Sequence, residues 1–296
     1  MARICLISLY EVNYMGTRCL ASWLQMHGHK TLNIFFKDMN WTYHDTPVEE
    51  HRGYQYVQGG QLVRSGWDIS PYSQTEVQLL RQAIADFTPD MVGLSARSPY
   101  DALAFDLISS FRQAAPSALL VAGGYGPTLR PEAYLQHGFD VVVRGDGEEA
   151  LLELADNLTN RSFCRVVANT SWLDSQSSIP IHNPLRPQEK NIDKYPPPLH
   201  GDPYCSFIDK DTLYKQCDPL GASSVTFTTK AVYSTFISRG CTGRCTYCSG
   251  GQWADLYKKS GSRAYKCRIR DTHQVLKELK EIDKNIIIFG VNFLHV

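Results

Sequence analysis

The chain has 296 residues, enough for two domains of ordinary size, and 43% of them are hydrophobic, so a sizeable core can be buried. Its 30 Lys and Arg residues balance 30 Asp and Glu residues, and a formal net charge of zero gives no sign of a nucleic-acid surface. No apolar run is long enough to span a bilayer, and no signal-peptide cleavage site follows Leu9, so we expect a cytoplasmic protein without nucleic-acid or membrane partners.

The first part of the chain alternates strand-like and helix-like stretches. Short apolar runs predict buried strands at Arg3–Leu9, Lys30–Phe36, Met91–Ala96, Ala118–Ala122 and Asp140–Val143. Apolar residues at helical spacing predict helices between and after them, at 20–27, 77–84, 103–111 and 148–158. This alternation is typical of βαβ units, so we predict an α/β domain over residues 1–160, a doubly wound parallel sheet of flavodoxin-like order.

Two stretches interrupt this pattern. Residues 37–74 are polar and aromatic without clear periodicity, which predicts a long functional or disordered loop. Residues 161–230 are rich in Pro and Ser, and three consecutive prolines at 196–198 favour an extended conformation. We therefore expect residues 161–230 to be a linker between two domains.

The alternation restarts in residues 231–296 and surrounds a cysteine-rich loop. Strands are predicted at Val232–Ile237 and Asn285–Phe289, and a capping box at Asp271 predicts the start of a helix between them. Three of the nine cysteines crowd into the loop after the first strand, whereas the other six are scattered. This usage indicates a metal site in a reducing compartment and not a secreted disulfide framework.

The clustered cysteines are Cys241, Cys245 and Cys248, with the spacing Cys-x-x-x-Cys-x-x-Cys. Three thiolates on one tight loop can bind three irons of a [4Fe–4S] cluster, and the fourth iron then stays open to a small molecule. Zinc and chance clustering are the alternatives. Zinc normally takes four ligands, but the sequence offers only Cys267 downstream and no His at finger spacing, so the cluster is favoured.

The run from Arg239 to Cys248 resembles the cluster loop of the radical S-adenosylmethionine (SAM) superfamily, where an aromatic residue commonly precedes the third cysteine, as Tyr247 does here. The resemblance implies that Cys241, Cys245 and Cys248 ligate the cluster and that SAM chelates its open iron, with Tyr247 among the cofactor-binding residues. It also implies reductive cleavage of SAM to a 5′-deoxyadenosyl radical, chemistry that the cofactor carries and the protein positions. Residues 231–296 would then be the start of a radical SAM barrel.

Two glycine-rich motifs stand where predicted strands end. Gly123 and Gly124 follow one strand, and Gly145 and Gly147 follow the next. Glycines at the carboxyl ends of parallel strands let the backbone approach a large ligand at the sheet crevice, although structural turns also explain them. Glu148 opens a helix, where a carboxylate is favourable.

Together these motifs are similar to the cobalamin-binding domain that precedes the barrel in one large group of radical SAM enzymes. The resemblance implies a corrinoid on the carboxyl edge of the sheet, with residues 10–14 near the corrin face. It implies cofactor contacts from Ser95, Gly123, Gly124, Tyr125, Gly145, Gly147 and Glu148. The sequence lacks the Asp-x-His-x-x-Gly stretch of the cobalamin mutases, and Tyr125 stands where the group often has His. We therefore expect no protein histidine on cobalt.

The two motifs in this order imply a cobalamin-dependent radical SAM enzyme. The implied reaction is methyl transfer to an unactivated carbon or phosphorus centre, or a related radical rearrangement. The expected partners are a small-molecule or natural-product substrate and a reductant such as flavodoxin or ferredoxin. The alternative is a non-catalytic cobalamin-binding module with a remnant cluster loop.

The region after the cluster loop is shorter than the resemblance implies. A complete barrel needs six βα units of about 30 residues each, but only 55 residues follow Cys241. We therefore expect a barrel truncated after its first part. Three readings stay open: a fragment of a longer enzyme, a short form whose open barrel edge another subunit covers, or a binding module.

Overall fold

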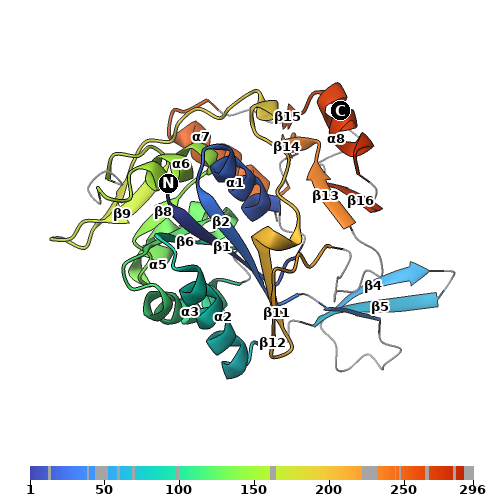
Figure 1. Ribbon diagram of the computed structural model, residues 1–296. Helices are drawn as coiled ribbons and strands as arrows, with labels where there is room; N and C mark the ends of the chain where they lie inside the picture. The colour runs from blue at the N-terminus through green and yellow to red at the C-terminus, as the bar shows by residue number, and fades with distance from the viewer. Residues whose placement is uncertain are drawn as a thin grey trace.

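A largely parallel sheet lies at the centre of the computed structural model (Figure 1). The structure describes residues 1–12, 15–38, 40–43, 53–58, 61–68, 71–97, 100–160, 165–221, 232–243, 245–246, 248–263, 267–282 and 285–289. In this part of the chain, nine strands form the sheet in the order β10-β9-β8-β7-β6-β1-β2-β11-β12.

The parallel strands β2, β1, β6, β7 and β8 follow one another in the predicted flavodoxin-like order. Their bounds are Arg3–Leu9 for β1, Lys30–Phe36 for β2, Met91–Ser95 for β6, Leu119–Gly123 for β7 and Val141–Val143 for β8. These apolar runs are buried along almost their whole length, because helices cover both faces of the sheet. The predicted doubly wound parallel sheet is confirmed.

The covering helices match the predicted alternation and add two short ones. Their bounds are Met15–Met26 for α1, Gln74–Phe87 for α2, Asp101–Ala114 for α3, Tyr125–Leu129 for α4, Pro131–Gln136 for α5 and Glu148–Asp156 for α6. Side chains of β1 alternate between the two faces. Ile7 packs in the cluster that α2 and α3 cover, whereas Ile4 and Leu6 pack with α1 and α6.

The region 161–230, which we expected to be a linker, contributes strands to the central sheet. Its described elements are β9 (Thr170–Leu173), β10 (Pro180–His182), the 3₁₀ turns η3 (Ile192–Lys194) and η4 (Asp202–Tyr204), β11 (Cys205–Asp209) and β12 (Thr212–Lys215). β11 pairs in parallel with β2, and β9 pairs antiparallel with β8. Such short strands among prolines produce no clear apolar period. An extended linker therefore describes only stretches such as 196–200, and the division into domains at residues 160 and 230 stays a prediction.

The segment 37–74, expected to be a loop without regular structure, also contains strands. β3 (Asn40–Tyr43), β4 (Gly53–Gln58) and β5 (Gln61–Asp68) form an antiparallel sheet in the order β3-β5-β4. In Figure 1 the β4–β5 hairpin projects away from the central sheet. The expectation of an irregular loop is wrong here, because a mainly polar sequence has no apolar period to reveal strands that backbone pairing holds together.

The C-terminal part begins a second α/β unit. Its described elements are β13 (Val232–Phe236), β14 (Ser238–Gly240), α7 (Ser249–Lys259), β15 (Cys267–Ile269), α8 (Thr272–Lys280) and β16 (Asn285–Phe289). β13 pairs in parallel with β16, whereas β14 and β15 form an antiparallel pair that we call the ribbon. Asp271 caps α8 by accepting a hydrogen bond from the Gln274 N–H (3.1 Å), so the predicted helix start is confirmed.

None of the helices within the described ranges combines the length and the apolar character that a membrane crossing requires.

A buried ion pair ties α1 to the segment that follows β12. The Arg18 guanidinium donates to both carboxylate oxygens of Asp218, at 2.7 and 2.9 Å, and both side chains are at most 2% exposed. His200 lies beside this pair, with Nε2 2.9 Å from the Ser234 carbonyl oxygen and Nδ1 3.3 Å from Arg18 Nη1. Burial lowers the pKa of His200, although its contact with Asp218 opposes this change. The imidazole is therefore neutral in the folded chain at neutral pH.

Replacing His200 with Gln is expected to weaken the pH dependence of stability. In the wild-type chain, the free energy of unfolding should decrease as the pH falls below the ordinary His pKa of 6.5, because the unfolded chain binds a proton that the folded ring resists. One such proton corresponds to at most about 1.4 kcal/mol per pH unit, and His200→Gln should remove up to that slope. Urea unfolding between about pH 5 and about pH 7.5 measures it.

His273→Gln is the matched control for this experiment, because the His273 side chain is 95% exposed. It should leave the slope unchanged. Identical slopes for wild type and His200→Gln would show that His200 does not titrate with unfolding in this range.

Candidate functional site

The carboxyl ends of β1, β6, β7 and β8 meet at one edge of the sheet. Ser95, the last residue of β6, pairs with Gly123, the last residue of β7. The Ala96 N–H donates to the Gly123 carbonyl oxygen (2.9 Å), and the Gly126 N–H donates to the Ala96 carbonyl oxygen (3.2 Å). The structure thus brings Ser95 and the first glycine motif together at this edge.

The glycines of the first motif differ in their surroundings. Gly124 has a φ of 96°, and a Cβ on it would lie 2.8 Å from the Ala96 carbonyl oxygen and 3.2 Å from Ser95 Oγ. The close approach of the two strand ends therefore requires Gly124. A Cβ on Gly123 would instead meet, among the described atoms, the Val143 carbonyl oxygen at an ordinary contact distance of 3.8 Å. The packing of the protein therefore requires a glycine at position 124 and leaves room for a Cβ at position 123.

The glycines of the second motif pack against other parts of the chain. Gly145 has a φ of 79°, and the Tyr257 hydroxyl of α7 occupies the place where a Cβ would lie. That hydroxyl accepts a hydrogen bond from the Asp146 N–H (3.2 Å), and burial raises the pKa of Tyr257. A Cβ on Gly147 would lie 3.5 Å from the Leu20 side chain of α1. Close packing by Tyr257 of α7 therefore accounts for the glycine at position 145, whereas a Cβ at position 147 would make only an ordinary contact with α1.

Glu148 does not face an open site. It is the first residue of α6, its side chain is 5% exposed, and it accepts a hydrogen bond from the Arg239 guanidinium (2.5 Å). Asp146 is bound in the same way by Arg268 of β15. The β8–α6 loop therefore contacts the ribbon on either side of the cysteine loop.

Tyr125 begins α4 and stays 41% exposed at the sheet edge. Its ring centroid lies 4.9 Å from that of Trp253, so an aromatic pair joins α4 to α7. Tyr10 follows β1 directly, is buried, and stacks on Tyr100 with the ring centroids 5.4 Å apart. Tyr14, at the far end of the segment expected near the corrin face, lies outside the described residues.

The cysteine loop lies between β14 and α7. The Gly243 N–H donates to Cys241 Sγ (3.2 Å), and the Gly250 N–H donates to Cys248 Sγ (3.4 Å). A Cβ on Gly243 would lie 3.3 Å from Cys241 Sγ and 3.7 Å from Cys245 Sγ. The loop therefore turns without a side chain beside two of its thiols, and hydrogen bonds from the backbone orient the sulfurs. Both features suit thiolates that hold a bulky inorganic group.

The clustered cysteines are accessible, whereas most of the other described cysteines are not. Cys241 is half-buried, and Cys245 and Cys248 are exposed. The buried cysteines are Cys5, Cys19, Cys205 and Cys217. Among the described residues, no three Cys, His, Asp or Glu side chains form a site for a single metal ion. Tyr247, which the resemblance counts among the cofactor-binding residues, lies outside the described residues.

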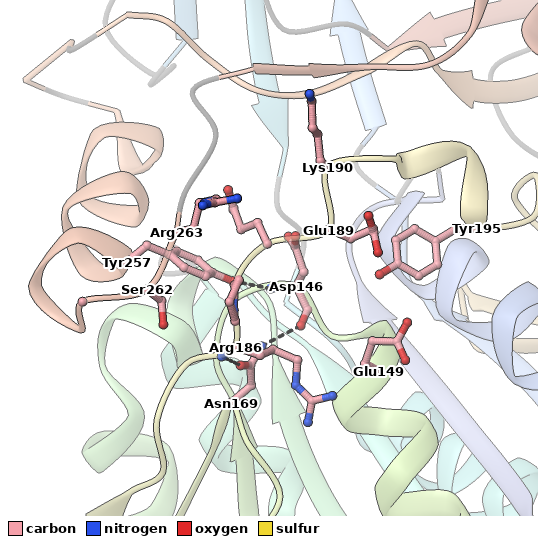
Figure 2. Close-up of a pocket in the computed structure, with 13 residues that line it drawn as sticks. Asp146, Glu149, Asn169, Arg186, Glu189, Lys190, Tyr195, Tyr257, Ser262 and Arg263 are labelled. Atoms are coloured by element: carbon pink, nitrogen blue, oxygen red, sulfur yellow. Dashed lines mark hydrogen bonds between the residues drawn. The ribbon is translucent and has the colours of Figure 1, made fainter.

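A cavity of about 660 Å³ lies beside the β8–α6 loop. Side chains from three segments converge on it, including Asp146 after β8, Tyr195 after η3 and Tyr257 from α7 (Figure 2). The Asn169 side-chain N–H donates to the Asp146 carbonyl oxygen (3.1 Å), and the Arg186 N–H donates to Asn169 Oδ1 (2.7 Å). The sequence did not reveal this cavity, because much of its wall comes from the region that we expected to be a linker.

Comparison with known proteins places this arrangement among cobalamin-binding proteins. The model of the "B12 binding domain" family matches residues 8–155. The chain is 27% identical over 223 residues to an anaerobic magnesium-protoporphyrin IX monomethyl ester cyclase of Cereibacter sphaeroides, covering 72% of this chain and 31% of that protein. It is also 27% identical over 172 residues to an uncharacterized methyltransferase of Pyrococcus horikoshii, covering 57% of this chain and 33% of that protein. The chain thus spans about a third of the length of these curated relatives.

Solved structures share the fold over nearly the whole chain. The cobalamin-dependent SAM radical enzyme OxsB, solved with aqua-cobalamin and SAM, has a TM-score of 0.63 and 17% identity, covering 99% of this chain and 34% of OxsB. The radical SAM methyltransferase TsrM from Kitasatospora setae, solved with tryptophan and a SAM analogue, has a TM-score of 0.59 and 13% identity, covering 98% of this chain and 48% of TsrM.

Proposed function

The chain belongs to the B12-binding domain family, and from this we propose that it is the cofactor-holding part of a cobalamin-dependent radical SAM enzyme. The predicted resemblance to that group is confirmed by the family match and by the similarity to the cyclase, OxsB and TsrM. One observation carries the proposal for the cluster. The loop with Cys241, Cys245 and Cys248 is anchored beside the carboxyl edge of the cobalamin-binding sheet.

In this proposal, Cys241, Cys245 and Cys248 hold a [4Fe–4S] cluster and leave one iron for SAM. When bound, the cluster would supply radical chemistry and the corrinoid a transferable methyl group. The contribution of the chain is to hold the thiolates in place. The backbone N–H groups of Gly243 and Gly250 point at two of the sulfurs and support their negative charge.

The corrinoid would lie against Ser95 and Gly123, where the fold leaves room for close approach. The residues that directly follow β1, β6, β7 and β8 include Tyr10, Tyr125 and Arg144 but no histidine. This composition supports the proposal that no histidine of the chain binds cobalt at this edge.

Methyl transfer to an unactivated carbon or phosphorus centre is the reaction that we propose for the complete enzyme. The Pyrococcus relative is a methyltransferase by name, and so is TsrM. Ring chemistry is the second candidate, because a relative that matches 72% of this chain is a cyclase by name. In either case we propose a small-molecule substrate and a reductant such as flavodoxin or ferredoxin.

The production of 5′-deoxyadenosine or S-adenosylhomocysteine tests the proposal. The chain is reconstituted anaerobically with iron, sulfide and cobalamin, and then incubated with SAM and a strong reductant. We expect either product to accumulate in proportion to the bound iron, and chain without iron to produce neither. If chain with a fully loaded cluster yields neither product, the proposal that this chain is competent for SAM cleavage by itself is wrong, and the protein is either a fragment that is inactive alone or a cobalamin-binding module.

A further inference from the structure

The ribbon places two arginines next to each other. In the antiparallel register of β14 and β15, Arg239 lies directly opposite Arg268, and the next pair is Gly240 opposite Cys267. Directly opposite residues share one face of a sheet, and like charges in such a pair destabilise it. The ribbon therefore needs negative charge on its arginine face.

The β8–α6 loop and the first residue of α6 supply that charge. The Arg239 guanidinium donates to Glu148 Oε1 at 2.5 Å, and Arg268 donates to the two carboxylate oxygens of Asp146 at 2.5 and 3.4 Å. Each of the four side chains is at most 19% exposed. Removing one partner of a buried ion pair leaves an uncompensated charge, so the two carboxylates hold the ribbon in this position.

Arg239 is also held between aromatic rings. Its guanidinium carbon lies 4.7 Å from the ring centroid of Phe236 and 5.5 Å from that of Tyr195. Only Gly240 separates Arg239 from Cys241. Fixing the guanidinium therefore fixes the point at which the chain enters the cysteine loop.

We propose that Asp146 and Glu148 are positioning residues that hold the cysteine loop in place for its cluster, acting through Arg268 and Arg239. This inference rests on the function proposed above, because it requires the loop to hold a cluster. It assigns Glu148 to the cluster side of the site, in contrast to the corrinoid contact that the family resemblance implies. Neither carboxylate ligates iron.

The rate at which a chelator removes iron from the reconstituted chain measures how firmly the loop is held. Glu148→Gln keeps the size of the side chain and removes its charge. We expect it to release iron about 10-fold faster than wild type, because loss of outer-shell partners weakens metal sites by about 10- to 100-fold. Asp146→Asn should act in the same direction.

A double-mutant cycle separates positioning from general damage to the structure. Arg239→Gln should accelerate iron release about as much as Glu148→Gln, and the double variant should be no faster than either single variant, because partners of one pair do not act independently. If the acceleration of iron release in the double variant equals the product of the two single accelerations, the proposed pairing is wrong.

Cys241 provides a readout that needs no cluster. It is half-buried in the loop, whereas Cys245 and Cys248 are already exposed. Alkylation of Cys241 in the iron-free chain, mapped by mass spectrometry, should be faster in Glu148→Gln than in wild type. Unchanged alkylation of Cys241 would mean that Glu148 does not hold the loop.

Glu76→Gln is the matched control. Glu76 forms a comparably buried pair with Lys37 (2.7 Å), and its helix α2 lies on the opposite side of the molecule from the ribbon (Figure 1). This variant should lower thermal stability but keep the wild-type rate of iron release. If it releases iron as fast as Glu148→Gln, the positioning role is wrong. If wild-type chain takes up no iron, the proposed function fails, and the Cys241 alkylation still tests whether Glu148 holds the cysteine loop.

Discussion

Replacing Cys241, Cys245 and Cys248 together with Ala is expected to reduce the iron content of the reconstituted chain from about four atoms to almost none. The reason is local, because these thiols are accessible on one loop and two of them accept backbone hydrogen bonds. Iron and sulfide analysis with the visible absorption spectrum measures the loss. Single substitutions should each remove most of the iron, since a cluster with two thiolate ligands is held weakly.

Buried cysteines provide the controls for the triple variant. Burial raises the pKa of the Cys19 thiol to about 11 and that of Cys205 to about 12, so neither is available as a thiolate at neutral pH. Cys205→Ala should therefore keep the full iron content. Cys267 is the sharper comparison, because it lies opposite Gly240 on the ribbon. If Cys267→Ala also loses the iron, a fourth ligand exists and no iron is left open for SAM.

Replacing Gly123 with Val is expected to weaken cobalamin binding at least about 10-fold, which corresponds to about 1.4 kcal/mol. A Cβ at this position would lie 3.8 Å from the Val143 carbonyl oxygen, an ordinary contact, so we expect the fold to tolerate the side chain while the close approach of a corrinoid is blocked. Titration of the chain with cobalamin, followed by visible absorption, gives the dissociation constant. Thermal unfolding checks that the fold is retained.

Two other glycine substitutions are controls for the Gly123→Val variant. Gly124→Ala should destabilise the fold itself, because its φ is 96° and its Cβ would lie 2.8 Å from the Ala96 carbonyl oxygen. Gly251→Ala on α7 meets no atom within 4 Å and should leave cobalamin binding unchanged. If Gly123→Val binds cobalamin as tightly as wild type, the corrinoid does not approach the end of β7.

The accuracy of the sequence-based fold prediction depends on how local each signal is. Arg3–Leu9 and Lys30–Phe36 are short segments rich in apolar residues, and the structure has β1 and β2 at these same bounds. β11 is not predictable from its own sequence in this way. It is placed by its pairing with β2, which joins Cys205 to Asn33 across most of the chain. No sequence window contains the information for such a pairing, which tertiary packing provides.

The same distinction applies to the candidate site. The three cysteines lie within one loop, so their spacing is readable and carries a chemical meaning. The contacts of Glu148 cannot be predicted from its sequence neighbours, because its partner Arg239 is 91 residues away in the chain. A helix-opening glutamate after a glycine is typical both of a ligand-facing turn and of a structural anchor. Only the folded arrangement distinguishes the two.

Helix α7 connects the cysteine loop to the end of strand β8. Cys248 caps its first turn through the bond from the Gly250 N–H, and Tyr257 in its last turns fills the space over Gly145. The nine helical residues from Ser249 to Tyr257 span about 14 Å. The third cysteine and the tyrosine that contacts the end of strand β8 are therefore held by the same helix. A rotation of the helix that moves the sulfur also moves the tyrosine, so neither end can be redesigned without regard to the other.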